Sequence, residues 1–291
     1  MKIAELAGRE VTPAFGDRVA LLDSSAPQDY REIAALLAEQ WADRRPHFVG
    51  LAGGQGAGKS TLSALIASAC AEVGVRVCVL SLDDFYYPLS IRRERASRLH
   101  PLFETRGPPG THEMDLCRLL MERLQRDEEV DLPAFDKGID DRVGVRSVRG
   151  PFDLVLLEGW CVGAQPEAES QLDVPINLLE ETKDADGRWR RLVHDYLSDS
   201  YARTWQMLDY LIFLRVPNLE AVRRWRLQQE SGRPRHQRLD SDAIDHFVQH
   251  YERTTLAMDR VLPSEADLVV DLSEDHSVSA MKFRSAQSDQ G

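Results

Sequence analysis

Short runs of mostly apolar residues recur along the chain, separated by segments whose apolar residues follow a helical spacing. A continuous apolar run is typical of a strand buried on both faces of a parallel sheet. Such runs cover residues 47–52, 75–82, 152–157, 209–216 and 266–272. The helical spacing covers residues 59–73, 113–126, 189–208, 242–258 and a segment that starts near Asn218. This alternation predicts an α/β fold with a mostly parallel sheet flanked by helices.

Both ends of the chain lack this alternation. Residues 1–45 contain one clear helical pattern, at 30–41, and are interpreted as an N-terminal extension with one helix. Residues 273–291 are expected to form a flexible tail. Residues 87–110 are rich in Arg, Pro and Gly, which indicates a long functional loop. The sequence shows no internal repeat, so residues 1–272 are predicted to form a single domain.

The amino-acid composition excludes several classes of protein for this chain. The chain has 291 residues, 43% of them hydrophobic, which is enough for a sizeable core. Its net charge of −12 argues against a general nucleic-acid-binding protein, whose affinity rests on cations. The apolar runs are too short to span a membrane, and the first residues do not resemble a signal peptide. The four cysteines lack a metal-binding or disulfide spacing, so we expect reduced thiols in a cytoplasmic protein. The sequence does not determine the oligomeric state.

The strongest motif follows the first apolar run and precedes a long helix. Residues 53–60 match G-x-x-x-x-G-K-[ST]. Glycines allow successive backbone N–H groups to turn toward phosphate oxygens, and the positive end of the following helix adds to the attraction. Lys59 is predicted to reach the β- and γ-phosphates of ATP, and the Ser60 hydroxyl to bind Mg²⁺. The predicted nucleotide-binding residues are Gly53, Gly54, Gln55, Gly56, Ala57, Gly58, Lys59, Ser60 and Thr61.

Two carboxylates, Asp83 and Asp84, follow the second apolar run. In an open α/β sheet, ligands bind at the carboxyl ends of the strands. A carboxylate there can accept a proton from an attacking hydroxyl and help to hold Mg²⁺. On these residues alone, an ordinary turn at the end of a strand is an equally good interpretation.

Four basic or potentially basic residues lie in loops between these carboxylates and Glu158. Each of them alone is more often a solvated surface charge. Together they favour a small anionic acceptor, because a guanidinium holds a carboxylate through two hydrogen bonds. These candidate substrate-binding residues are Arg106, His112, Lys137 and Arg142, with the phosphates of the nucleotide as the other possible partner of Lys137.

The glycine-rich motif followed by Asp83-Asp84-Phe85-Tyr86 resembles the small-molecule P-loop kinases of the uridine kinase, pantothenate kinase and phosphoribulokinase group. Further segments are similar to the plant-type D-glycerate 3-kinase branch and its bacterial and fungal relatives. They lie at residues 106–112, 132–137, 140–142, 158–163 and 225–230, within a resemblance that covers about residues 48–271.

This resemblance implies roles for individual residues. Asp83 would be the base that deprotonates the acceptor hydroxyl, although the doubled aspartate leaves Asp84 as the other choice. Asp83 and Glu158 would share the Mg²⁺ with Ser60. Asp84 and Tyr86 would belong to the acceptor site.

The resemblance also implies an arginine-bearing lid that closes over the phosphates, with Arg223 and Arg226 as catalytic residues beside Lys59. Arg233, Arg235 and Arg238 are further lid candidates. Positive groups there would offset the charge that develops during transfer, and closure would exclude water.

The sequence therefore predicts a kinase that transfers the γ-phosphoryl group of Mg·ATP to a hydroxyl of a small molecule, with D-glycerate preferred. One alternative is a kinase of the same group whose acceptor is a nucleoside, pantothenate or a sugar phosphate. A more distant alternative is a P-loop ATPase or switch that acts on a protein partner.

Overall fold

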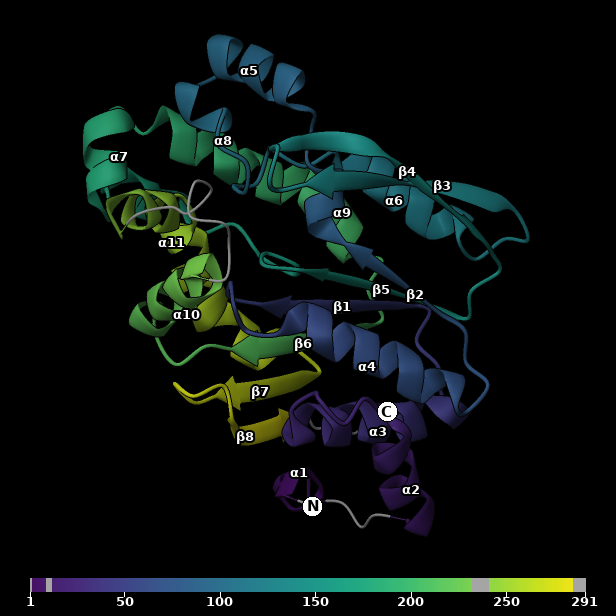
Figure 1. Ribbon diagram of the computed structural model, residues 1–291. Helices are drawn as coiled ribbons and strands as arrows, with labels where there is room; N and C mark the ends of the chain where they lie inside the picture. The colour runs from purple at the N-terminus through teal and green to yellow at the C-terminus, as the bar shows by residue number, and fades with distance from the viewer. Residues whose placement is uncertain (1, 9–11, 232–240, 285–291) are drawn as a thin grey trace, which may run out of the picture.

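The computed structural model describes residues 2–8, 12–231 and 241–284, and within them a twisted sheet runs through the centre of the molecule (Figure 1). Its strands lie in the order β2-β5-β1-β6-β7-β8. All neighbours are parallel except β8, which runs antiparallel to β7. The predicted parallel α/β fold is confirmed. The strands are β1 (Phe48–Gly53), β2 (Val77–Ser81), β5 (Leu154–Gly159), β6 (Tyr210–Arg215), β7 (Leu268–Leu272) and β8 (Val278–Phe283).

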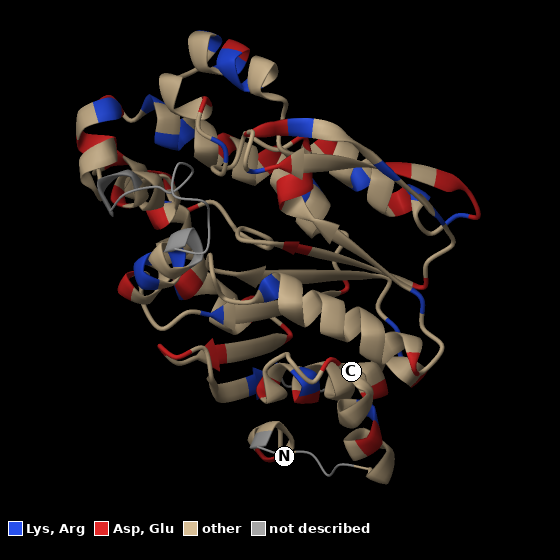
Figure 2. Cartoon of the chain, in the orientation of Figure 1, with Lys and Arg blue, Asp and Glu red and all other residues tan. Residues whose placement is uncertain are grey.

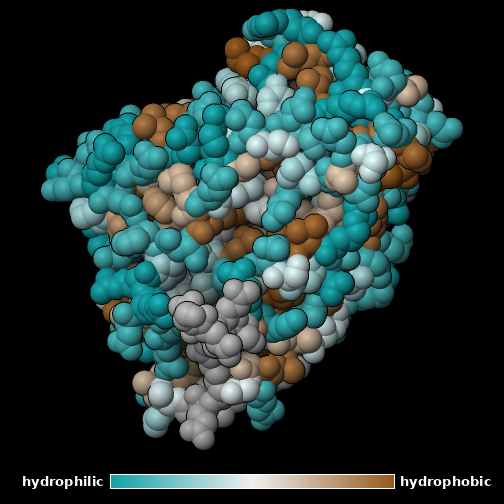
Figure 3. Space-filling view, turned by 180° about the vertical axis from the view of Figure 1, so that it is seen from behind, coloured by the Kyte–Doolittle hydropathy of each residue, from teal (hydrophilic) through white to brown (hydrophobic). Residues whose placement is uncertain are grey.

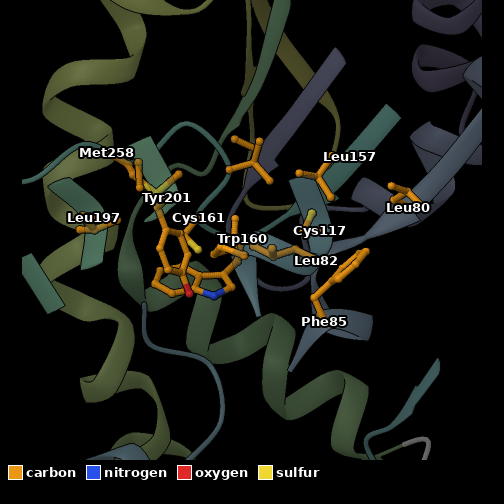
Figure 4. Close-up of a cluster of buried hydrophobic side chains, with 14 of the residues drawn as sticks. Leu80, Leu82, Phe85, Cys117, Leu157, Trp160, Cys161, Leu197, Tyr201 and Met258 are labelled. Atoms are coloured by element: carbon orange, nitrogen blue, oxygen red, sulfur yellow. The ribbon is translucent and has the colours of Figure 1, made fainter. Parts of the chain in front are cut away.

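Side chains alternate between the two faces of this sheet, so each face has its own core. Along β5, for example, Leu154 and Leu156 belong to one cluster, and Val155 and Leu157 to the other. The first cluster packs against α3 (Gln28–Asp43) and α4 (Lys59–Ala71). The second packs against α6 (Met114–Arg123), α8 (Arg188–Tyr196) and α11 (Ser241–Glu265). Figure 4 shows part of this cluster, with Trp160 and Tyr201 among the labelled side chains.

The remaining elements connect and cover these layers. A π-helical turn, η4 (Leu197–Tyr201), joins α8 to α9 (Ala202–Trp205). A 3₁₀ turn, η1 (Leu82–Phe85), follows β2 and carries Asp83 and Asp84. Three further connecting elements are η3 (Glu169–Asp173), α7 (Leu178–Lys183) and α10 (Leu219–Ser231). Acidic and basic residues lie mostly on the outer elements, and the central strands carry few of them (Figure 2).

A hairpin outside the main sheet is not among the predicted elements. It consists of β3 (Glu129–Asp136) and β4 (Asp141–Arg149), which pair antiparallel to each other. Val130 and Leu132 are buried, whereas most of β4 is exposed. Because only one strand carries an apolar alternation, the pattern of this segment resembles a loop. The hairpin matters for function because its turn reaches the candidate site.

Three predictions about helices and tails are wrong. The N-terminal extension has three helices in the described residues, α1 (Lys2–Leu6), α2 (Pro13–Leu21) and α3, because two short helices are each anchored mainly by one buried side chain, Ile3 and Phe15. The predicted loop 87–110 contains α5 (Leu89–Arg98) and the 3₁₀ turn η2 (Pro101–Phe103). The predicted tail contains β8, whose Val278 N–H donates to the Asp29 carboxylate at 2.9 Å.

Helix α5 could not be predicted from an apolar pattern, because the residue that anchors it to the rest of the fold is polar. The side chain of Arg92 is fully buried and donates to the carbonyl oxygens of Tyr87, Glu104 and Asp140. Apolar periodicity is therefore absent from the helix, although the helix is tied closely to the neighbouring loop and hairpin.

The surface is mainly hydrophilic on the face seen from behind, with hydrophobic patches between the polar residues (Figure 3). Among the described residues, no helix combines the length and the apolar character that a membrane span requires.

Candidate active site

The phosphate loop connects the end of β1 to the start of α4. Gly58, the residue before the helix, has a φ of 78°, a left-handed conformation that favours glycine. A Cβ at Gly58 would come within 2.7 Å of the Tyr30 ring. The Tyr30 hydroxyl donates to the Ala57 carbonyl at 2.5 Å. Helix α3 thus contacts the phosphate loop through Tyr30 and helps to fix its conformation. The first backbone amides of α4 have no partner within the helix and can bind an anion.

Lys59 and Ser60 are the first residues of α4, and both line the candidate site. The Lys59 ammonium donates to the Gly54 carbonyl at 3.0 Å, folded back over its own loop. The Ser60 hydroxyl donates to the Glu158 carboxylate at 3.0 Å. Burial lowers the pKa of Lys59, and the charges of Glu158 and Asp83 act in the opposite direction.

A cavity of about 400 Å³ opens above the phosphate loop at the carboxyl ends of β1, β2 and β5. This is the edge at which open α/β sheets bind ligands. The lining combines the loop with side chains from the hairpin turn, α10 and α11. The lining residues are Gln55, Gly56, Gly58, Lys59, Ser60, Thr61, Asp83, Tyr86, Arg106, Lys137, Glu158, Gly159, Trp160, Arg226, Phe247 and Tyr251.

Asp83 faces this cavity and forms an ion pair with Lys137 of the hairpin turn at 2.5 Å. Burial opposes ionisation of Asp83 and is the largest single effect on its pKa. The charge and hydrogen bond of Lys137 outweigh it, with help from other cations, and the pKa falls to about 2. Asp83 is therefore ionised and faces the phosphate loop.

Asp84 is directed elsewhere. Its carboxylate accepts a hydrogen bond from the Phe135 amide at 3.1 Å, which fixes the hairpin to the η1 turn. Burial raises the pKa of Asp84. Asp84 is not among the residues that line the cavity, and its place in the acceptor site stays a prediction. Of the two aspartates, Asp83 is the one that lines the cavity.

Arg106 also lines the cavity and forms an ion pair with Asp140. Its loop is clamped by two aromatic residues. Tyr251 donates its hydroxyl to the Arg106 carbonyl, and Trp160 donates its indole N–H to the Gly107 carbonyl, both at 3.0 Å. Gly107 has a φ of 122°, and a Cβ there would lie 1.8 Å from the Tyr251 oxygen, so only glycine fits.

Three other predicted residues do not reach the cavity. His112 is buried, its ring stacks on the Tyr86 ring with 4.3 Å between the ring centroids, and its Nδ1 shares a 2.6 Å hydrogen bond with the Tyr201 hydroxyl. Burial lowers the pKa of His112 to about 3, so the imidazole supplies no positive charge. Arg142 donates to the Tyr86 and Phe85 carbonyls and pairs with Glu113. Arg223 pairs with Asp245 at 3.4 Å, between α10 and α11. All three therefore hold the surrounding structure together.

Arg226 does line the cavity, with its guanidinium 5.4 Å from the centre of the Phe247 ring. Phe247 and Tyr251 are site residues that the sequence analysis missed. They lie four residues apart on α11, but an aromatic pair at helical spacing is typical of a core. The predicted lid residues Arg233, Arg235 and Arg238 lie outside the described residues.

The Ser60 hydroxyl and the Glu158 carboxylate form an oxygen pair suited to Mg²⁺. No group of three or more His, Cys, Asp or Glu side chains in the described part of the chain could hold a metal ion by itself. Mg²⁺ usually binds to proteins through one or two side chains and takes its other ligands from phosphates and water.

Comparisons with known proteins place this site in context. No protein-family model matches the chain. The chain is 30% identical over 227 residues to uncharacterized kinase mug58 of Schizosaccharomyces pombe, covering 71% of this chain and 79% of that protein. It is 25% identical over 231 residues to the chloroplastic D-glycerate 3-kinase of Arabidopsis thaliana, covering 72% of this chain but only 47% of that protein. The chain thus spans about half the length of the plant enzyme.

A solved structure of D-glycerate 3-kinase from Cryptococcus neoformans has a TM-score of 0.72 and 24% identity, covering 89% of this chain and 100% of that one. At this identity the likeness concerns the fold. The phosphate loop and the Asp83 carboxylate line one cavity, and together with the kinase relatives this makes the chain a P-loop phosphotransferase. The relatives narrow the class: the chain belongs to the P-loop kinases of the uridine kinase and glycerate kinase group, whose phosphoryl acceptor is an alcohol. The predicted family is confirmed.

Proposed function

We propose that the protein transfers the γ-phosphoryl group of ATP to a hydroxyl of a small carboxylated metabolite, with D-glycerate as the first candidate. The observation that carries this proposal is the composition of the cavity. Its phosphate loop faces Asp83, and two cations, Arg106 and Lys137, flank the space between them. A base and an anion-binding pair therefore lie where an acceptor would meet the nucleotide.

Each residue has a role in the proposed reaction. The phosphate loop and Lys59 bind the triphosphate, and Ser60 and Glu158 would hold Mg²⁺, which neutralises charge on the phosphate oxygens when it is bound. Asp83 accepts the proton of the acceptor hydroxyl. We assign Asp83, which lines the cavity, to proton transfer, and Ser60 with Glu158 to the metal. Lys59 and Arg226 offset the charge that develops on the transferring group.

The acceptor class follows from the same side chains. A nucleoside offers no anionic group to Arg106 and Lys137, and burying two cations against a neutral ligand is costly. A short hydroxy acid supplies both a carboxylate for the cations and a hydroxyl for Asp83. The printed name of the plant relative supports this choice. A kinase of the same group with another anionic acceptor, such as a sugar phosphate, is the second candidate, because it would satisfy the same cations.

One assay tests the proposed function. ADP release is measured with Mg·ATP alone and then with a panel of D-glycerate, other hydroxy acids, sugar phosphates, pantothenate, nucleosides and neutral polyols. We expect the strongest stimulation from D-glycerate. Stimulation by a nucleoside alone would contradict the role of the two cations. ATP turnover that none of the compounds stimulates would favour an ATPase that acts on a protein partner.

Replacing Arg106 with Ala is expected to raise the KM for the acceptor on the order of 10- to 100-fold, because a hydrogen-bonded charge pair contributes about 1.5–3 kcal/mol. The KM for ATP should change little. Asp140, the present partner of Arg106, keeps Arg92 at 3.0 Å and is not left unpaired. Steady-state kinetics with each substrate varied in turn measures both constants.

A matched control is Arg93→Ala, because Arg93 is a largely exposed arginine of α5 that pairs only with Glu104 among the described residues. It should leave both constants unchanged. An equal loss for ATP and acceptor in the Arg106 variant would count against a role in acceptor binding.

A further inference from the structure

Both cations of the acceptor site are already paired with carboxylates, but the two pairs differ in kind. Arg106 pairs with Asp140, which also pairs with Arg92, and the side chain of Arg92 is fully buried. Arg106 therefore belongs to a three-residue arrangement with Asp140 and Arg92 that does not include the proposed base. Lys137, in contrast, is paired with Asp83, the proposed base itself.

The surroundings of Lys137 allow its side chain to change partner. Its side chain is 49% exposed, whereas that of Asp83 is 25% exposed. The backbone of the hairpin turn is held on both sides of Lys137. The Asp141 carboxylate accepts from the Leu89 amide at 2.9 Å, and the Asp84 carboxylate fixes Phe135. The ammonium can thus leave Asp83 through side-chain rotation alone, without movement of the hairpin.

We propose that Lys137 senses the acceptor: it engages Asp83 while the acceptor site is empty, and it releases that carboxylate to the substrate hydroxyl when an anionic group of the acceptor takes its ammonium. This inference rests on the proposed kinase function and adds a mechanism by which the enzyme selects anionic acceptors. A carboxylate or phosphate next to the hydroxyl replaces Asp83 as the partner of Lys137. A neutral acceptor offers no such replacement.

The step that follows is a balanced phosphoryl transfer. The hydroxyl proton moves to the released Asp83 carboxylate as the acceptor oxygen forms a bond to the γ-phosphorus. The bond between the γ-phosphorus and the bridging oxygen breaks, its electron pair remains on that oxygen, and ADP leaves. Water in place of the acceptor would give ADP and phosphate by the same steps. The ion pair therefore has a second effect, because it restrains hydrolysis of ATP while no acceptor is bound.

The energetic cost of this exchange is small. A pair with one half-exposed partner contributes little to stability, because solvent competes for both charges. With an anionic acceptor, the Lys137 ammonium exchanges Asp83 for the carboxylate or phosphate of the substrate and also binds that substrate. A neutral acceptor gains no such contact with Lys137 and leaves Asp83 paired, and the discrimination against neutral acceptors follows from that difference.

The test uses Lys137→Met in the full-length protein, with ADP release measured for Mg·ATP alone, with D-glycerate and with glycerol, which lacks the carboxylate. We expect acceptor-independent ADP release to rise roughly 3- to 10-fold. The kcat/KM for D-glycerate should fall, so that the preference for D-glycerate over glycerol decreases at least about 10-fold. Lys137→Arg, which keeps the charge, should restore most of the preference. Adding Asp83→Asn to Lys137→Met should remove the gain in ADP release.

Arg149→Met is the matched control, because Arg149 is an exposed cation of the same hairpin that pairs with Asp127, away from the cavity. Its acceptor-independent ADP release and its preference for D-glycerate over glycerol should equal those of the unmodified protein. An unchanged preference for D-glycerate over glycerol in Lys137→Met, or acceptor-independent ADP release that falls, would overturn the sensor while leaving the kinase function in place. If D-glycerate fails to stimulate even the unmodified protein, the proposed function and the sensor both fall.

Discussion

Asp83→Asn is expected to lower turnover at saturating ATP and acceptor about 10²- to 10⁴-fold, because an amide of the same shape cannot accept the hydroxyl proton. ATP should still bind with nearly the same Kd, since its phosphates are held by the loop at residues 53–60. Single-turnover kinetics measures the chemical step, and calorimetry measures the affinity for ATP. An Asp83→Asn protein that keeps its turnover would remove Asp83 from the base role.

The neighbouring variant Asp84→Asn is a sharp control for this experiment. The Asp84 oxygen that accepts from the Phe135 amide is retained in Asn, so the hairpin stays in place. Its turnover should remain within a few-fold of the unmodified protein, because its carboxylate does not line the cavity. A larger loss in Asp84→Asn than in Asp83→Asn would exchange the roles of the two aspartates.

Lys59→Met is expected to reduce turnover on the order of 10²- to 10³-fold and to weaken ATP binding, because it removes the cation that faces the β- and γ-phosphates. In the structure the ammonium already lies over the loop, 3.0 Å from the Gly54 carbonyl. The length of Met fills most of the same space. Turnover and the Kd for ATP are measured together, and thermal unfolding verifies that the variant is folded.

Lys282→Met, on the edge strand β8, serves as the control because Lys282 does not line the cavity. Full activity in the Lys59 variant would mean that the triphosphate does not lie along this loop, and the proposed arrangement of ATP and acceptor would have to be abandoned.

The elements that could be predicted from the sequence share a physical cause. Strands β1, β2, β5, β6 and β7 carry apolar side chains that pack on both faces of the sheet, so their apolar runs are continuous and conspicuous. The phosphate loop was predictable because its function constrains residues adjacent in the chain, including Gly58 and Lys59. Asp83 could be identified because it follows a strand that ends at the ligand-binding edge.

The remaining features depend on contacts that no local pattern reveals. Arg106, His112, Lys137 and Arg142 look alike in the sequence as cationic residues of loops. The structure separates them, because burial leaves His112 neutral and backbone carbonyls occupy Arg142. Tyr251 enters the site from a helix that is distant in the chain, through a hydrogen bond to the Arg106 carbonyl. Pairings between residues so far apart are set by the folded chain.

The edge strand β8 has a practical meaning for work on this protein. The motifs that resemble other kinases lie within residues 48–271, and a shortened protein ending there would seem to keep every proposed catalytic residue. It would lose Val278, which is fully buried in the same cluster as Leu268 and Val270 of β7 and Ile3 of the first helix. It would also uncover the hydrogen-bonding edge of β7, and exposed edges of this kind promote aggregation. Minimal versions of the enzyme should therefore extend at least through Phe283.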